Sequence, residues 1–265
     1  MKTIVPIASA LALSLAPLAA LAELQTDTID YKVNGEDFTG YLTYDDEFEG
    51  KRPGVLVVHE WWGLDEFARQ EAEKLAKAGY TAFALDMYGS GNRATHPDDA
   101  KKFMQATMGD KQALEARFRT AMDILKGHDT VESSKIAAQG YCFGGAVVLN
   151  MARMGLDLDG VVSFHGSLGS DVQAKKGDVS ARILSYTGGA DPFVPTDQVT
   201  GFVAEMVNAE ADLTLVSFPG VKHSFMVPDA DATGEKFDLP MGYDEAAAQR
   251  AWQGTQDFYQ KIFAD

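Results

Sequence analysis

The chain has 265 residues, of which 46% are apolar, and its 23 basic and 39 acidic side chains give a formal net charge of −16. Such a composition supports a well-buried core, while the negative charge repels nucleic acid and anionic membranes, so we expect neither as a partner. The charge also opposes an anionic substrate, unless a local Lys or Arg offsets it.

The first 22 residues have the pattern of a secretory signal peptide. Lys2 supplies a positive charge, residues 4–21 are mostly apolar, and an A-x-A cleavage motif ends at Ala22. A retained membrane anchor is the weaker alternative, because two prolines interrupt the run and no stop-transfer charges follow it. We therefore expect cleavage after Ala22 and a periplasmic or secreted protein. The mature chain, residues 23–265, is expected to form one domain that makes no membrane contact.

In the mature chain, short apolar strands alternate with amphipathic helices. The expected strands are residues 26–33, 36–44, 53–59, 80–86, 135–139, 160–164, 182–187 and 212–218. The first expected helix begins at Asp65 and ends before Gly79. Further helices are expected at residues 99–126, with a break near Gly109, and at 146–153, 196–208 and 243–263. Loops are expected at 87–98, 166–180 and 229–242. This alternation predicts an α/β fold with one mostly parallel central sheet flanked by helices, and Asn34-Gly35 predicts an N-terminal β-hairpin.

The stretch Gly140-Tyr141-Cys142-Phe143-Gly144-Gly145 lies between an expected strand and an expected helix. This is the context of the G-x-nucleophile-x-G turn, in which flanking glycines let the chain turn sharply and expose the central residue. The central residue is the only cysteine of the chain, so no intramolecular disulfide can form. A thiolate here would be a strong nucleophile. The alternative is a Gly-rich turn that buries an inert cysteine.

Three further polar residues each follow an expected strand, as Cys142 does: Glu60, Asp191 and His223. Ligands of parallel sheets bind at the carboxyl ends of the strands, so these side chains could converge there. The order Cys142, Asp191, His223 is that of nucleophile-elbow hydrolases, with the histidine as base and the aspartate as its orienting partner. Alternatively, Asp191 initiates a turn before Pro192 and His223 is an exposed loop histidine.

The same hypothesis predicts an oxyanion hole made by the backbone N–H groups of Phe143 and Trp61. Aromatic pocket walls would come from Trp61, Trp62, Tyr88, Phe143, Phe193 and Phe225, although ordinary packing at the sheet edge explains these residues equally. His59, inside an apolar strand, is interpreted as a core histidine. His165 ends a strand and could line the site, but a structural role is the favoured interpretation. No metal-binding or nucleotide-binding spacing is present, so we expect no metal and no cofactor.

Several of these motifs together resemble the dienelactone hydrolase family. They are Val58-His59-Glu60-Trp61-Trp62-Gly63, Asp86-Met87-Tyr88, the cysteine turn, Ala190-Asp191-Pro192 and His223-Ser224-Phe225. The resemblance spans nearly all of the mature chain and implies an α/β-hydrolase fold, no cofactor, and a Cys142–His223–Asp191 triad. It further implies that Glu60 helps to convert the Cys142 thiol into a thiolate when substrate binds.

Two arginines that hold the substrate carboxylate in that family are missing here. The matching positions are Ser90 and Val227. Arg93 is near enough to replace the first through a different loop path, whereas an acidic stretch follows the second. Together with the negative net charge, this favours a neutral or monoanionic ester or lactone over a dianionic one.

The sequence thus predicts an exported, monomeric hydrolase of small carboxylic esters or lactones that acts through a Cys142 acyl-enzyme. A second hypothesis is a non-catalytic protein that binds a small molecule on the same fold, which the missing arginines favour mildly. A third is a thiol redox sensor using Cys142, which the absence of a resolving cysteine disfavours.

Overall fold

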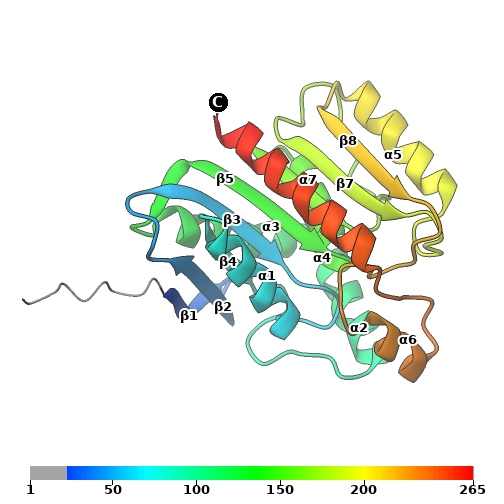
Figure 1. The fold of residues 1–265 in the computed structure, drawn as a ribbon, viewed down its shortest axis with the longest axis horizontal. Helices are drawn as coiled ribbons and strands as arrows, with labels where there is room; N and C mark the ends of the chain where they lie inside the picture. Colours follow the sequence, from blue (N-terminus) through cyan, green and yellow to red (C-terminus); the bar gives the residue numbers. More distant parts are fainter. Residues whose placement is uncertain (1–22, 265) are drawn as a thin grey trace, which may run out of the picture.

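The structure, a computed structural model, describes residues 23–264, so the expected signal peptide lies outside the described residues. The described chain folds into an eight-stranded sheet of order β1-β2-β4-β3-β5-β6-β7-β8 with helices on both faces (Figure 1). The strands are β1 (Leu24–Val33), β2 (Glu36–Asp45), β3 (Arg52–Val58), β4 (Thr81–Leu85), β5 (Val131–Tyr141), β6 (Gly160–Phe164), β7 (Arg182–Gly188) and β8 (Leu213–Phe218). The helices are α1 (Glu66–Lys77), α2 (Pro97–Gly109), α3 (Lys111–Lys126), α4 (Phe143–Arg153), α5 (Thr196–Asn208), α6 (Ala230–Phe237) and α7 (Glu245–Ala264).

The sheet is mostly parallel, as predicted. From β3 to β8 every neighbouring pair is parallel, whereas β1 pairs antiparallel with β2, and β2 with β4. Asn34 and Gly35 join β1 to β2 and both have positive φ, 51° and 88°. These values suit a two-residue turn that matches the strand twist, so the predicted hairpin is confirmed.

Two apolar cores cover the two faces of the sheet. In β3, Leu56 and Val58 face one core while Val55 and Val57 face the other, and all four are fully buried. Helices α1 and α7 pack on the face nearest the viewer in Figure 1, and α3, α4 and α5 contribute to the core on the opposite face. Burial on both faces explains why the central strands are continuously apolar. Because β3 to β8 are parallel, they all end at the same edge of the sheet, and the loops that follow them start there.

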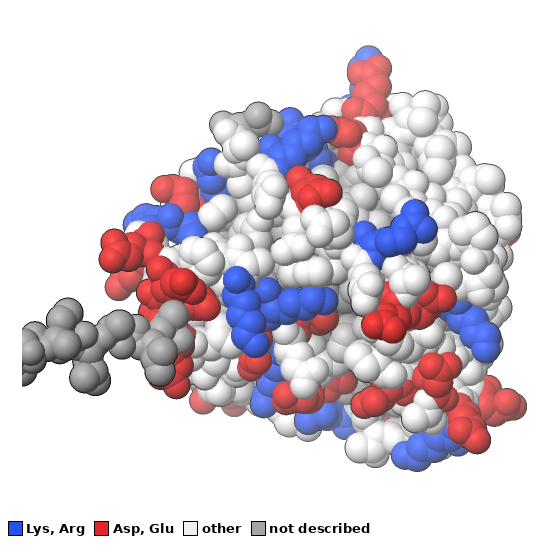
Figure 2. Space-filling view, in the orientation of Figure 1, with Lys and Arg blue, Asp and Glu red and all other residues white. Residues whose placement is uncertain are grey.

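Charged side chains of both signs share the surface. On the face shown in Figure 2, Lys and Arg are interspersed with Asp and Glu, and acidic side chains gather at the lower right, where Figure 1 places α6. None of the helices between residues 23 and 264 is long and apolar enough to cross a membrane.

The structure departs from the sequence analysis mainly near the C-terminus. Residues 229–242 were expected to be a loop, but Ala230–Phe237 is a helix, α6, which ends at Asp238 in the left-handed conformation (φ 53°). The acidic, weakly amphipathic sequence of this segment gave no helical pattern. After α6, the chain runs beside His223, whose carbonyl accepts a hydrogen bond from the Gly242 amide at 3.0 Å. This loop thereby becomes part of the candidate site.

Candidate active site

Cys142 occupies a strained turn between β5 and α4, with φ 52° and ψ −111°. A side chain rarely adopts a positive φ, and such strain is typical of functional positions. The turn depends on the absence of side chains at its glycines: a Cβ on Gly140 would lie 2.1 Å from the Gly144 carbonyl oxygen, and a Cβ on Gly144 would lie 2.2 Å from the Val58 carbonyl oxygen. The sequence therefore folds into this turn because only glycine permits helix α4 to approach the sheet so closely.

Asp191 and His223, which follow β7 and β8, meet beside this turn. Oδ2 of Asp191 lies 2.7 Å from Nδ1 of His223, and both side chains are buried. Asp191 also accepts a hydrogen bond from the Phe193 amide at 2.8 Å, so it shapes the local turn as well as contacting the histidine. The alternative in which His223 is an exposed loop residue is wrong, since only 7% of it is accessible.

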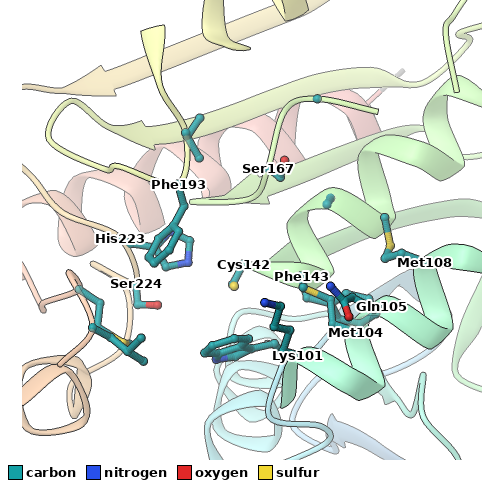
Figure 3. Close-up of a pocket in the computed structure, with 16 residues that line it drawn as sticks. Lys101, Met104, Gln105, Met108, Cys142, Phe143, Ser167, Phe193, His223 and Ser224 are labelled. Atoms are coloured by element: carbon teal, nitrogen blue, oxygen red, sulfur yellow. The ribbon is translucent and has the colours of Figure 1, made fainter. Parts of the chain in front are cut away.

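The electrostatics of His223 depend on Cys142. Figure 3 shows a ring nitrogen of His223 facing the Cys142 sulfur. Burial by itself lowers the pKa of His223, but the charge of Cys142 and the hydrogen bond with Asp191 outweigh burial and raise the pKa to about 10. A thiolate at Cys142 would therefore be paired with an imidazolium at neutral pH.

Glu60, which follows β3, belongs to a buried cluster beside the triad. Its Oε1 accepts a hydrogen bond from the Ser224 hydroxyl at 2.9 Å and lies 3.9 Å from Nδ1 of His165. Burial raises the pKa of Glu60 to about 7, although the charge of His223 and the Ser224 hydrogen bond lower it. A carboxyl with such a pKa can change its protonation near neutral pH.

His165 also belongs to this cluster, although a structural role was the favoured interpretation from its sequence position. The Cys142 amide donates a hydrogen bond to its Nδ1 at 3.2 Å, and its ring packs edge-on against that of His223, with centroids 5.2 Å apart. Its backbone is strained, with φ 42°. Burial, followed by the charge of His223, holds its pKa well below the ordinary value, so the ring is neutral. Its position directly after β6 was the available sequence signal. His59, in contrast, is a core histidine, as interpreted, since it is fully buried and accepts from the Met87 amide.

The two amides expected to form an oxyanion hole are available. Among the described residues, the N–H groups of Trp61 and Phe143 donate no hydrogen bond. Phe143 is the first residue of α4, so its N–H has no intrahelical acceptor and lies at the positive end of the helix dipole. Both residues line the same cavity as Cys142. The arrangement can therefore supply donors to an oxygen that bears developing negative charge.

A cavity of about 530 Å³ opens above Cys142 (Figure 3). Its walls are mostly apolar and come from seven stretches of the chain. They are made by Trp61, Lys101, Met104, Gln105, Met108, Cys142, Phe143, Ala146, Ser167, Gly169, Phe193, Val194, His223, Ser224, Leu239 and Met241. Three of the predicted pocket residues, Trp61, Phe143 and Phe193, are among them.

The other four predicted pocket residues do not line this cavity, so those assignments were wrong. Tyr88 is buried behind it and donates to the Trp61 carbonyl at 3.2 Å. Phe225 is fully buried in the core. Trp62 turns away and packs against Phe237 of α6, with ring centroids 6.0 Å apart. Arg93 is exposed, and its charge lies near Asp65 instead.

Sequence reasoning missed the cavity wall formed by α2 and by the loop after α6. Lys101 and Gln105 are spaced i, i+4 in α2, as are Met104 and Met108. Residues with this spacing share one face of a helix, which was the only available signal. No local pattern predicts that the loop after α6 forms part of the cavity wall. Its position depends on a β-bridge between Met241 and His223.

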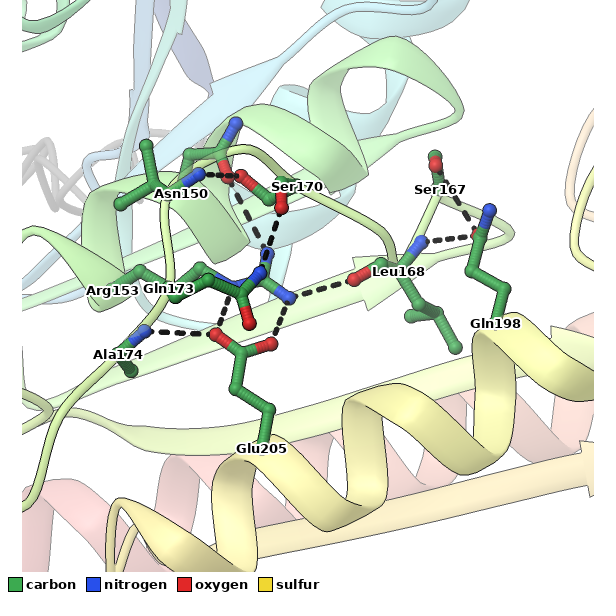
Figure 4. A network of polar contacts seen from close by, with 10 residues as sticks. Asn150, Arg153, Ser167, Leu168, Ser170, Gln173, Ala174, Gln198 and Glu205 are labelled. Atoms are coloured by element: carbon green, nitrogen blue, oxygen red, sulfur yellow. Dashed lines mark hydrogen bonds and ion pairs between the residues drawn. The ribbon is translucent and has the colours of Figure 1, made fainter.

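One wall of the cavity, at Ser167 and Gly169, is held by a buried polar network (Figure 4). The Arg153 guanidinium makes two hydrogen bonds to the Glu205 carboxylate, at 2.9 and 2.8 Å, and a third to the Leu168 carbonyl at 2.6 Å. Gln198 accepts from the Leu168 amide at 2.7 Å and from the Ser167 hydroxyl at 3.2 Å. This loop is therefore fixed to helices α4 and α5.

Within residues 23–264, no cluster of three or more His, Cys, Asp or Glu side chains has the arrangement of a metal site. The site brings together the Cys142 thiol, the imidazoles of His223 and His165, and the carboxyls of Asp191 and Glu60.

Comparison with known proteins gives a consistent result. The model of the dienelactone hydrolase family matches residues 38–263. The chain is 29% identical to Protein usf of Aquifex pyrophilus, over 88% of this chain and 97% of that one. It is 28% identical to a putative carboxymethylenebutenolidase of Aquifex aeolicus, over 87% and 96%. Its structure is similar to that of a dienelactone hydrolase-like promiscuous phosphotriesterase from metagenomic libraries, with a TM-score of 0.82, 29% identity and coverage of 90% and 98%.

Proposed function

We propose that this chain, which belongs to the dienelactone hydrolase family, cleaves small carboxylic esters or lactones. The proposed reaction proceeds through an acyl-enzyme on Cys142. The observation that carries this proposal is the hydrogen bond of 2.7 Å between Asp191 and His223, beside a strained turn that presents Cys142 to a cavity. His223 acts as general base and acid, and Asp191 fixes its tautomer.

In the acylation step, the Cys142 thiolate attacks the carbonyl carbon of the substrate. The carbonyl oxygen becomes an oxyanion and accepts hydrogen bonds from the N–H groups of Trp61 and Phe143. As the C–O bond to the leaving group breaks, the His223 imidazolium donates its proton to the departing oxygen. The products are a thioester on Cys142, a neutral His223 and a free alcohol, or a tethered one from a lactone.

In the deacylation step, the charge of Cys142 is absent, because its sulfur is acylated. That charge is one of the causes that raise the pKa of His223, so acylation lowers the pKa of the ring relative to the free protein, while Asp191 continues to raise it. A neutral His223 can take a proton from a water molecule, whose oxygen attacks the thioester. The C–S bond breaks, and the thiolate and the imidazolium are restored.

Glu60 takes part in forming the thiolate. No hydrogen bond joins Glu60 to Cys142 among the described residues, and its carboxyl is held by Ser224. With a pKa of about 7 and a position between His165 and Ser224, Glu60 can shift its proton or its position when substrate enters. Such a change alters the field at His223 and so the balance between thiol and thiolate.

The protein is proposed to work outside the cytoplasm, as a monomer. Export rests on the sequence of residues 1–22 alone. Fractionation of the producing cells and N-terminal sequencing of the mature protein test this proposal. A mature chain that begins at Glu23 is expected, and a cytoplasmic chain that retains Lys2 would contradict it.

Single-turnover mass spectrometry tests the chemistry. The mature protein is mixed with p-nitrophenyl acetate or with a neutral enol lactone, next to its Cys142→Ala variant. An acyl adduct on Cys142 that decays as product forms, and that is absent from the variant, is the expected result. If the folded, reduced protein forms no adduct and releases no product, the hypothesis of a non-catalytic binding protein replaces this one.

A further inference from the structure

The cavity above Cys142 has a mostly apolar wall with a few polar side chains. Apolar side chains make up most of its wall, among them Met104, Met108 and Met241, whose flexible thioethers adapt to varied ligand shapes. Its volume, about 530 Å³, is that of a site for a drug-sized ligand. A compact lactone would leave most of this wall without contacts, so the cavity favours a substrate with an extended apolar body.

Most polar side chains in this wall already have protein partners. Ser167 donates to Gln198, Ser224 to Glu60, and His223 pairs with Asp191. Lys101 and Gln105 differ: within residues 23–264 neither makes a hydrogen bond or an ion pair. They lie one turn apart on α2, and Figure 3 shows both extending from that helix into the cavity.

Of the residues that the structure describes, Lys101 is also the only lysine or arginine that lines the cavity, and none of the lining residues is Asp or Glu. In a chain with a net charge of −16, Lys101 thus places a basic side chain at the cavity, although Asp98 and Asp99 lie in the first turn of the same helix. An ammonium group beside an amide donor suits a carboxylate or a similar monoanionic group.

We propose that Lys101 and Gln105 bind an anionic group carried by an amphiphilic ester, whose apolar body lies against the apolar side chains of the cavity while its carbonyl carbon reaches Cys142. The proposal rests on the proposed hydrolase function and names its substrate class, a monoanionic ester with an extended apolar chain. It also assigns anion recognition to α2, and not to Arg93, which lies outside the cavity.

Two pairs of p-nitrophenyl esters test this assignment. Each pair differs only in its terminal group: the hexanoate against the mono-ester of adipic acid, and the octanoate against the mono-ester of suberic acid. The readout is the selectivity, the ratio of kcat/KM for the anionic ester to kcat/KM for the neutral one. Because a ratio is measured, a general loss of activity does not imitate the expected result.

In Lys101→Gln we expect the selectivity to fall about five- to tenfold, as for a partly shielded charge-assisted contact. Lys101→Glu should lower the selectivity further. Added salt should lower the selectivity of the unchanged protein, but it should have little effect on that of Lys101→Gln. The matched control is Lys102→Gln, since Lys102 is also exposed on α2 but does not line the cavity, and its selectivity should stay within about twofold.

Two results would overturn the proposal. One is an unchanged selectivity in Lys101→Gln while ester cleavage still depends on Cys142, which leaves the hydrolase intact and removes only the anion site. The other is a loss of selectivity in Lys111→Gln instead of Lys101→Gln, which would place the anion site at Lys111. Lys111 lines a neighbouring cavity of about 350 Å³ that shares Met108, Ser167 and Gly169 with this one. Absence of any Cys142-dependent cleavage would reject the proposed function and this inference together.

Discussion

Oδ2 of the Asp191 carboxylate lies 2.7 Å from Nδ1 of the His223 ring, and both groups are shielded from water. With Nδ1 engaged, the other ring nitrogen is the one that remains for Cys142. The carboxylate therefore fixes both the ring's orientation and the nitrogen that can exchange a proton with the sulfur. This contact joins the ends of β7 and β8 to the turn after β5, as expected at one edge of a parallel sheet.

Replacing Asp191 with Asn tests this relationship. The amide keeps the shape of the carboxylate but can donate to Nδ1, which stabilises the wrong tautomer of His223. We expect kcat/KM for p-nitrophenyl acetate to fall on the order of 10³–10⁴-fold with little change in unfolding. Asp197→Asn, on the exposed side of α5, is the control and should leave the rate constant as it is. Near-normal activity in Asp191→Asn would exclude a role for this carboxylate.

A pair of glycines tests the packing of the turn. A Cβ on Gly144 would approach the carbonyl oxygens of Val58 and His59 to 2.2 and 2.7 Å, and neither backbone group can move freely. Gly144→Ala should therefore lower the free energy of unfolding by about 3 kcal/mol or more, measured by urea denaturation. Gly201→Ala, within α5 and with open space around it, should raise it by about 0.5–1 kcal/mol. Equal effects of the two substitutions would contradict this explanation.

The polar residues of the site were predictable because each follows a strand. The turn around Cys142, together with Glu60, Asp191 and His223, is set by local sequence and by the rule that parallel strands end at one edge. His165 obeys the same rule, but a single histidine after a strand has no partner spacing that would reveal its contact with the Cys142 amide.

The cavity wall was much less predictable. Aromatic residues such as Tyr88 and Phe225 follow strands too, yet they are buried among neighbouring rings, and sequence proximity does not indicate which way a side chain turns. The residues that do form the wall, such as Met104 and Met241, come from α2 and from the loop after α6. Their placement depends on how these segments pack against the sheet edge, which no local pattern encodes.

Glu60 should make stability depend on pH. Its pKa is raised by burial from 4.5 to about 7, so the folded protein holds this proton more tightly than the unfolded chain does. The resulting stabilisation is complete below about pH 4.5 and is lost as the pH rises through about 7. We expect the unfolding free energy of the unchanged protein, relative to Glu60→Gln, to fall by about 3 kcal/mol between about pH 4.5 and about pH 8.

Urea denaturation of both proteins at the two pH values measures this difference, in which titrating groups that do not interact with Glu60 cancel. Glu49→Gln, in the exposed loop before β3, serves as the control for the loss of one acidic side chain. A difference between the unchanged protein and Glu60→Gln that is the same at both pH values would show that Glu60 titrates normally.

The buried ion pair between Arg153 and Glu205 should matter for both stability and binding. Only 1% of the Arg153 side chain and 9% of the Glu205 side chain are exposed, so Glu205→Gln would leave a buried guanidinium without its counter-charge. We expect the unfolding free energy to fall by about 3 kcal/mol, against less than about 0.5 kcal/mol for Glu115→Gln, which breaks the exposed pair with Arg119 on α3.

Because the same network holds the loop at Leu168, the KM for long-chain esters should rise in Glu205→Gln and not in Glu115→Gln. A loss of stability with an unchanged KM would mean that the network supports the fold without shaping the cavity.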